Sequence, residues 1–383
     1  NFLSSLDCII VFGGGRWART LLRVLYDIIP FSVKVCVCSP HNFLGLLEWS
    51  KNQGFDKHIQ VFRAYPEVKE KTSCAVIIAN AARDHEKAID WALSKHFPVL
   101  VEKPITLSLS GTARMIKLAN MNQTYLAASN VFLFARYIKN FARSVDDKGG
   151  AQSIRFCWTD PTTEKRYGEI KSYDSGLTVF SDWLPHVVSI LSFFAPRKEQ
   201  VIQRIKVLRG GAHLAINLRL GDINCEIELG RNGRFRERLL VVETKKGIMR
   251  LDYGIEPGII SCGAQVHSGE PDWDNKPKPV FQMLNAFLHG VVGGKRDERL
   301  DVELGLRANK LIDKIAPLYY CSLSSWLAKK WTKFDDNIDQ DMHYALCEAL
   351  SIYDPLSPVP IEQRVSYLYR EIKVSLSSTL ALD

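Results

Sequence analysis

Residues 97–104 have the sequence Phe-Pro-Val-Leu-Val-Glu-Lys-Pro, and this stretch decides the fold that we expect. Residues 98–101 form an apolar run, which is typical of a strand buried on both faces of a parallel sheet. Pro104 ends the strand because proline has no N–H for the next hydrogen bond of the ladder. Glu102 and Lys103 then face the crevice at the carboxyl ends of the strands, where doubly wound sheets bind ligands. An ordinary solvated strand end is the alternative for this pair.

The length and composition are those of a protein with two globular domains. The chain has 383 residues, of which 46% are hydrophobic and 24% charged, and a single core rarely grows to that size. The net charge of +8 favours an anionic ligand or an anionic surface as partner. The basic residues are spread along the chain without interleaved aromatic residues, so we expect no nucleic-acid partner. No apolar run reaches the roughly 18 residues of a membrane span, so we expect no membrane partner.

Cysteine usage favours a cytoplasmic protein. The nine cysteines are odd in number and lie mostly inside apolar runs, without the spacing of metal ligands. We therefore expect reduced core residues and no metal site. The segment that starts at Asn1 shows no basic and then apolar leader.

A glycine motif follows the first expected strand, residues 6–12, and precedes an amphipathic run at residues 20–29. The pattern is G-x-G-x-x-A. Gly13 permits a tight turn, Gly15 lets the backbone approach a pyrophosphate, and Ala18 keeps helix and strand close. Glycine triplets also occur in plain turns, but the flanking strand and helix favour dinucleotide binding. The other residues of the expected cofactor turn are Gly14, Arg16 and Trp17.

The second expected strand, residues 33–38, ends in Ser39-Pro40-His41. An NAD site usually carries an acid here, which binds the ribose 2′-hydroxyl. Without an acid nothing repels a 2′-phosphate, and Ser39, His41 and Arg16 can all donate to one. We therefore expect NADP as the preferred cofactor. NAD is the alternative if this loop points elsewhere.

Further strands at residues 60–63 and 73–79 alternate with helices at 86–94 and 110–120. This alternation predicts an open parallel sheet with right-handed crossovers. The small residues at 79–82 allow a flat nicotinamide ring to lie against the backbone. We interpret His85 as the start of a helix rather than as a catalytic group. The remaining expected cofactor contacts are Ala79, Asn80, His85, Glu102 and Lys103.

The pattern changes near residue 150, where strand-like runs follow one another without helices. The expected fold class is therefore α/β plus α+β: an N-terminal Rossmann doubly wound parallel sheet, a mostly antiparallel sheet domain and a helical C-terminal extension. The expected domains are residues 1–125, 126–320 and 321–383. In the extension we expect helices at residues 323–334, 340–352 and 361–375, which pack on the same oligomer or bind another protein.

One helical stretch, residues 177–194, interrupts the strands of the second domain. Asp182 and His186 are four residues apart and hence neighbours on one face of this helix. Pro185 suggests an irregular or early turn there. A carboxylate one turn from an imidazole can orient the ring for acid-base chemistry, although a purely structural pair is the alternative.

Three motifs together resemble the Gfo/Idh/MocA family of oxidoreductases, which includes inositol 2-dehydrogenase and glucose-fructose oxidoreductase. They are the glycine motif at residues 13–18, Glu102-Lys103-Pro104, and Gly176 followed by Asp182-x-x-x-His186. Residues 280–315 also look like the returning helices of that family. The resemblance runs from residue 6 to residue 318.

The resemblance implies that Lys103 is the catalytic lysine, His186 the acid-base histidine and Asp182 the carboxylate that supports them. It also implies a Rossmann domain, then an open-faced sheet that often forms an oligomer interface, so we expect a homodimer or homotetramer. The chain departs from the family in its shortened glycine-rich approach, Asp174-Ser175-Gly176, and at Ser189, where relatives often carry an acid.

The expected reaction is hydride transfer between nicotinamide and a carbinol carbon of a sugar, cyclitol or nucleotide sugar. Lys103 would stabilise the developing alkoxide and His186 would exchange the hydroxyl proton. An imine or double-bond reductase, and a protein that binds the cofactor without catalysis, are the alternatives.

Aromatic and cationic residues near these motifs are candidates for binding the substrate, and the positive charge favours a phosphorylated one. Each can equally be a surface or packing residue. They are Arg136, Tyr137, Lys139, Tyr167, Tyr173 and Trp183.

Overall fold

The computed structural model describes residues 3, 5–69, 71–166, 168–171, 173–331, 340–368 and 370. Its N-terminal sheet has six strands in the order β3-β2-β1-β4-β5-β6, all parallel. They are β1 (Cys8–Phe12), β2 (Lys34–Cys38), β3 (Ile59–Phe62), β4 (Cys74–Ile78), β5 (Val99–Val101) and β6 (Leu126–Ala128). In β1, Ile9 and Val11 join one core whereas Ile10 and Phe12 join the other, which explains the uninterrupted apolar run.

Helices cover both faces of this sheet, so the expected doubly wound fold is confirmed. On one face lie α1 (Arg16–Ile28), α2 (Phe43–Asn52) and, from much later in the chain, α7 (Pro279–Val291). On the other face lie α3 (His85–Ser94) and α4 (Leu109–Met121). Leu284 and Phe287 of α7 are fully buried in the core with α1, so the returning helix is part of the Rossmann domain.

The second sheet has eight strands in the order β10-β11-β12-β7-β13-β14-β15-β16. Neighbouring strands are antiparallel except β12 and β7, which are parallel. The strands are β7 (Ala151–Pro161), β10 (Gln200–Leu208), β11 (His213–Leu220), β12 (Ile223–Gly233), β13 (Glu237–Thr244), β14 (Gly247–Asp252), β15 (Ile259–Cys262) and β16 (Gln265–Ser268). A separate hairpin consists of β8 (Glu164–Arg166) and β9 (Glu169–Lys171).

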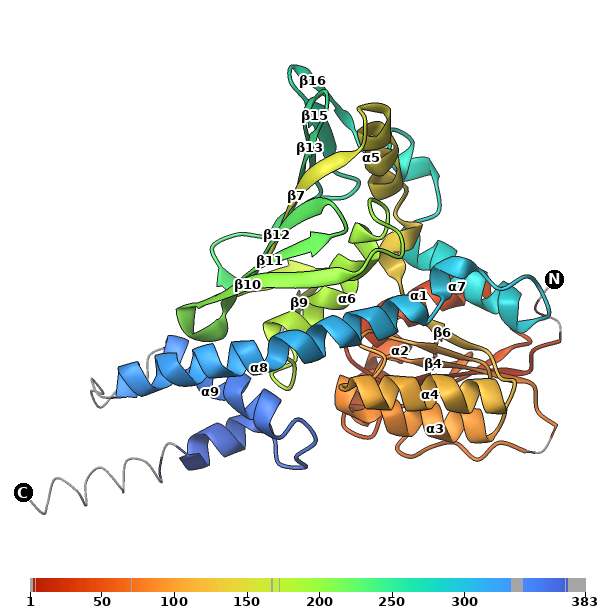
Figure 1. Cartoon of the computed structure of the whole chain (residues 1–383). Helices are drawn as coiled ribbons and strands as arrows, with labels where there is room; N and C mark the ends of the chain where they lie inside the picture. The colour runs from red at the N-terminus through yellow and green to blue at the C-terminus, as the bar shows by residue number, and fades with distance from the viewer. Residues whose placement is uncertain are drawn as a thin grey trace, which may run out of the picture.

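In the part of the chain that the structure describes, helices cover one face of the second sheet and leave the other open, so the expected open-faced sheet is confirmed. Ile227 and Leu229 of β12 are buried, whereas the alternating Glu226 and Glu228 are exposed, as the two-residue period of a strand requires. The covering helices are α5 (Arg136–Asp147), α6 (Val179–Leu191) and α8 (Glu303–Trp331). Figure 1 shows these helices on one side of the sheet and α8 extending toward the N-terminal domain.

The C-terminal extension packs on this body. The long helix α8 contacts α4, α6 and α9 (Gln340–Tyr353), and residues 361–368 form a further helix. The helix expected at residues 323–334 is the second half of α8 as far as Trp331, and residues 332–334 and 371–375 lie outside the described residues. Because α8 runs through residues 320 and 321, the expected domain boundary there falls within a continuous helix.

Several elements differ from the sequence-based expectation. Helices α2 and α5 and the hairpin β15-β16 were not predicted. In α5 the buried residues Tyr137, Phe141 and Val145 recur at helical spacing, so the pattern was present. Pro185 lies in the middle of α6 rather than in an early turn, where it removes one hydrogen bond of the helix.

Three further features follow from the described residues. All nine cysteines carry free thiols. No group of three or more metal-ligating side chains occurs among the described residues. Within the same part of the chain, no helix is both long and apolar enough to cross a membrane.

The packing of α7 predicts a large effect of Phe287→Ala on stability. The side chain is fully buried, so its truncation should lower the free energy of unfolding by about 3–5 kcal/mol. The shift of the denaturant midpoint measures this. Leu44→Ala on α2, where Leu44 is 69% exposed, is the control and should change the free energy of unfolding by less than about 0.5 kcal/mol. Equal midpoints for both variants would contradict the docking of α7.

Candidate active site

The glycine turn between β1 and α1 leaves an open cradle at the start of the helix. Gly13 has a φ of +122°, and a Cβ there would lie 2.4 Å from the carbonyl oxygen of Ala79, so glycine is required. A Cβ on Gly15 would meet nothing within 4 Å, and no side chain caps α1 at this residue. The helix N-terminus therefore faces a space that fits a pyrophosphate. Ala18 is fully buried, which allows α1 to pack closely on the sheet.

The end of β2 lies against this turn. Ser39 is buried, and its Oγ would lie 2.2 Å from a Cβ on Gly14. Asn42, which the sequence did not single out, donates a hydrogen bond of 2.8 Å to the carbonyl oxygen of Gly14. His41 is exposed. Arg16 and Trp17 form the first turn of α1, so the expected cofactor residues from both segments meet at one edge of the sheet.

The end of β4 forms the next part of the crevice. Ala79 donates a backbone hydrogen bond to Phe12 at the end of β1. Asn80 follows, and its Oδ1 is buried without a hydrogen-bond partner among the described residues, which suits the amide of a carboxamide ligand. His85 is buried, with its ring nitrogens 2.8 Å from the carbonyl oxygen of Pro104 and 3.2 Å from that of Asn80. These two contacts connect the segments that follow β4 and β5. Burial lowers the pKa of His85.

Glu102 and Lys103 follow β5 directly, as expected. The Ser129 hydroxyl donates to Oε1 of Glu102 at 2.5 Å, and burial raises the pKa of Glu102. Lys103 extends to the second domain, where its Nζ donates to Oδ1 of Asp182 at 2.5 Å and to its carbonyl oxygen at 2.8 Å. The expected catalytic lysine therefore bridges the two domains.

Asp182 lies between two cations. Its Oδ2 accepts a hydrogen bond of 2.9 Å from Arg231 of β12, whose side chain is almost fully buried. Burial by itself raises the pKa of Asp182, but Lys103 and Arg231 outweigh it and hold that pKa well below its usual range. The carboxylate is thus ionised at all physiological pH values and can fix the position of the ammonium.

His186 lies one turn further along α6, in an aromatic setting. Its ring stacks on Trp158 at 5.4 Å and meets Phe132 edge to face at 5.0 Å. Burial, and next the positive charge of Lys103, lower the pKa of His186 well below its usual value. Among the described residues its ring makes no hydrogen bond, so Asp182 does not orient His186 as a hydrogen-bonded pair. The expectation of such a pair is corrected here: the oxygens of Asp182 bind Lys103 and Arg231 instead.

A second charged cluster lies next to His186. Asp160 forms ion pairs with Lys171 of β9 and Arg238 of β13, and the Arg238 guanidinium lies 3.8 Å from the ring centroid of Trp158. The same hairpin reaches the glycine turn, because Glu169 pairs with Arg19 of α1. The β8-β9 hairpin therefore connects the expected substrate and cofactor regions.

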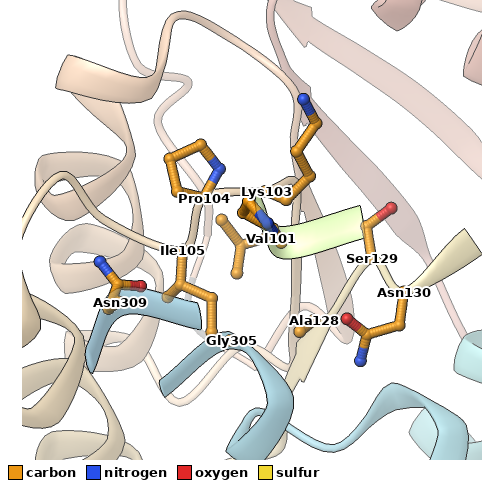
Figure 2. A pocket seen from close by; sticks show the side chains of 10 residues that line it. Val101, Lys103, Pro104, Ile105, Ala128, Ser129, Asn130, Gly305 and Asn309 are labelled. Atoms are coloured by element: carbon orange, nitrogen blue, oxygen red, sulfur yellow. The ribbon is translucent and has the colours of Figure 1, made fainter. Parts of the chain in front are cut away.

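A pocket opens beside Lys103 where β5, β6, α6 and α8 meet. In Figure 2 the Lys103 side chain points away from Ile105 and Asn309, so its ammonium leaves the pocket toward the second domain. The lining residues are Val101, Lys103, Pro104, Ile105, Ala128, Ser129, Asn130, Pro185, Gly305 and Asn309.

The candidate substrate residues lie in varied settings. Trp183 and Tyr137 are buried, and the Tyr137 hydroxyl donates to Glu256 at 2.8 Å. Tyr173 is 40% exposed, with its ring centroid 4.5 Å from the Arg231 guanidinium. Arg136 pairs with Glu270. Lys139 is exposed, and Tyr167 lies outside the described residues. Among these residues, Tyr173 and Trp183 both contact the guanidinium of Arg231.

Sequence reasoning missed Arg231, although the sequence held a signal for it. Cys225, Ile227 and Leu229 alternate with polar residues along β12, and this alternation places residue 231 on the inward face. A single arginine on an apolar face needs a buried anion as its partner. That partner was not predictable, because Asp182 and Glu348 are distant in sequence.

Comparisons with known proteins agree with this fold. The structure resembles the 3-ketoreductase KijD10 from Actinomadura kijaniata, solved with TDP-benzene and NADP, with a TM-score of 0.64 and 17% identity over 80% of this chain and 96% of that one. It also resembles UDP-N-acetylglucosamine 3-dehydrogenase GnnA from Acidithiobacillus ferrooxidans, with a TM-score of 0.63 and 14% identity over 83% and 99% of the chains. At these identities the likeness concerns the fold. No curated protein matches the chain.

The glycine turn, the end of β4 and Lys103 all lie within the segment that matches a family model. Residues 8–129 match the model of the GFO_IDH_MocA oxidoreductase family with an NAD-binding Rossmann fold. Over its N-terminal domain the chain is therefore similar to the GFO_IDH_MocA oxidoreductases.

Proposed function

We propose that the protein is an NAD(P)-dependent oxidoreductase that transfers a hydride between nicotinamide and a carbonyl or hydroxyl carbon of a sugar, cyclitol or nucleotide sugar. The observation that carries this proposal is the position of Lys103. Its ammonium leaves the carboxyl end of β5, lies 2.5 Å from Asp182 and faces the helix that bears His186. A bound nicotinamide supplies or accepts the hydride; the residues of this chain supply charge and proton transfer.

In this proposal Lys103 stabilises the oxygen of the reacting carbon. An ammonium that a buried carboxylate already holds needs little reorganisation when an alkoxide develops. His186 accepts the hydroxyl proton during oxidation and returns it during reduction. Its lowered pKa keeps the ring neutral at pH 7, as the base form requires.

We infer that the cofactor turn prefers NADP. The end of β2 carries buried Ser39 where NAD enzymes usually carry an acid. The backbone N–H of Ser39 donates a hydrogen bond to Phe62 at the end of β3, so the next residue, Arg63, lies near Ser39. Arg63 and Arg16, the first residue of α1, are the cations that can neutralise a 2′-phosphate there. KijD10, which shares the fold, was solved with NADP.

The substrate class is proposed from charge and from the two relatives. KijD10 was solved with a TDP ligand, and GnnA is a dehydrogenase of a UDP sugar. The net charge of +8 supports a phosphorylated or nucleotide-linked substrate. We also propose a cytoplasmic homo-oligomer, a dimer or tetramer, because all nine thiols are free and the described helices leave one face of the second sheet open.

Lys103→Ala should abolish turnover and leave cofactor binding intact. Loss of a preorganised charge at the reacting oxygen should lower kcat at least about 100-fold. The nicotinamide absorbance follows turnover on a panel of keto sugars and nucleotide sugars, and NADPH fluorescence measures binding. Lys87→Ala, at an exposed lysine of α3, is the control with unchanged kcat. Full activity of Lys103→Ala would refute the assigned role.

The pH dependence should reflect the neutral ring of His186. Because the pKa of His186 in the folded protein lies well below 6.5, the base form persists as the pH falls through 6.5. The acidic limb of kcat/KM for alcohol oxidation should therefore lie well below pH 6.5 and vanish in His186→Gln. A limb at or above pH 6.5 that vanishes in this variant would contradict the account.

Ser39→Asp should shift the cofactor preference toward NAD. A carboxylate beside Gly14 repels the 2′-phosphate, so the Kd of NADPH should rise at least about tenfold. The Kd of NADH should fall or stay constant. Fluorescence titrations measure both values, and Ser39→Ala is the control without added charge. An unchanged preference in Ser39→Asp would show that other groups select the cofactor.

A further inference from the structure

A buried arginine connects the expected catalytic residues to the C-terminal extension. Arg231 is 1% exposed. Its Nη2 donates to Asp182 at 2.9 Å, while its Nη1 lies 3.4 Å from Oε1 of Glu348 and 3.2 Å from the hydroxyl of Tyr344. Tyr344 and Glu348 both belong to α9. The single positive charge is therefore shared between a carboxylate of the site and a carboxylate of the extension.

Glu348 is itself held by three different elements. Its side chain is 3% exposed, and Oε1 faces Arg231 of β12. Oε2 accepts a hydrogen bond from the Tyr319 hydroxyl of α8 at 2.8 Å and from the backbone N–H of Val179 at 3.3 Å. Val179 is the first residue of α6, so Glu348 also lies at the positive end of the helix that bears Asp182.

The turn that receives the extension has no room for side chains. Gly210 has a φ of +61°, and a Cβ there would lie 2.3 Å from the carbonyl oxygen of Asp341 on α9. Gly211 has a φ of +94°, and a Cβ there would lie 2.2 Å from the Tyr319 hydroxyl. Two consecutive glycines thus permit the close contact of this turn with α8 and α9.

We propose that Glu348 is a positioning residue of the active site, which acts through Arg231 on the ion pair between Asp182 and Lys103. When Glu348 is charged, it draws part of the Arg231 charge away from Asp182. The Asp182 carboxylate is then available to hold the Lys103 ammonium. When the charge of Glu348 is removed, Arg231 interacts with Asp182 alone and competes with Lys103 for it. The C-terminal extension is accordingly part of the catalytic unit.

The experiment compares Glu348→Gln with Asp341→Asn. Both variants remove one negative charge from α9 and keep the side-chain shape, but the Asp341 side chain is 36% exposed and lies 3.9 Å from Arg209, outside the site. We expect Glu348→Gln to lower kcat roughly tenfold with an unchanged KM for the cofactor. Asp341→Asn should match the wild type in both values.

A second measurement is independent of turnover. Reductive methylation with formaldehyde and cyanoborohydride, followed by peptide mapping, gives the labelling rate of each lysine. Lys103 should react several-fold faster in Glu348→Gln than in the wild type or Asp341→Asn, because an ammonium released from Asp182 is more accessible. The labelling rate of Lys87 should not change.

The inference on turnover rests on the proposed function, whereas the labelling result does not. A wild-type protein without turnover would refute the proposed function and leave the labelling test valid. A folded Glu348→Gln protein with wild-type labelling of Lys103 would overturn the positioning role. If Glu348→Gln does not fold, Glu348→Asp replaces it. The aspartate side chain is one methylene shorter, so its carboxylate is withdrawn from Arg231, whose Nη1 is already 3.4 Å from Oε1 of Glu348. The same outcomes then apply.

Discussion

The structure depends on the pairing of one buried charge, the guanidinium of Arg231. A buried cation is costly unless anions and hydrogen-bond acceptors surround it. Here the acceptors are Asp182, Glu348, the Tyr344 hydroxyl and the carbonyl oxygen of Leu177. The contacts of Arg231 with these acceptors bring together the start of α6, the end of β12 and the C-terminal extension. Asp182 also binds Lys103 of the Rossmann domain. The arrangement of the site and the packing of the two domains thus have a common physical origin.

The crevice between the domains combines two different kinds of scaffold. The Rossmann edge supplies backbone N–H groups at the glycine turn and small residues at the end of β4, both suited to a dinucleotide. The mixed sheet supplies aromatic and charged side chains, with Trp158 against His186 and Arg238 against Trp158. Helices α7 and α8 return to the first domain and keep the two edges together. An oxidoreductase needs both surfaces, one for the cofactor and one for the substrate.

The sequence predicted local features well and long-range contacts poorly. The glycine turn and the strand before Lys103 follow from short-range patterns, and the structure confirms these elements. The open face of the second sheet was expected only from the resemblance to the family. The spacing of Asp182 and His186 correctly placed both on α6 but did not reveal the partner of Asp182. That partner comes from β12, and Glu348 from a helix after residue 340. Such contacts depend on tertiary packing, which no periodicity within one segment encodes. The assigned roles of the site residues remain predictions.

A crystal structure of the protein with bound NADPH tests the central claim most directly. The account predicts that the pyrophosphate lies on the N-terminus of α1 and that the nicotinamide ring lies between Asn80 and Lys103, with its reactive carbon open to the space in front of His186. A cofactor bound with its nicotinamide away from Lys103 and His186, or bound outside the glycine turn, would contradict the account.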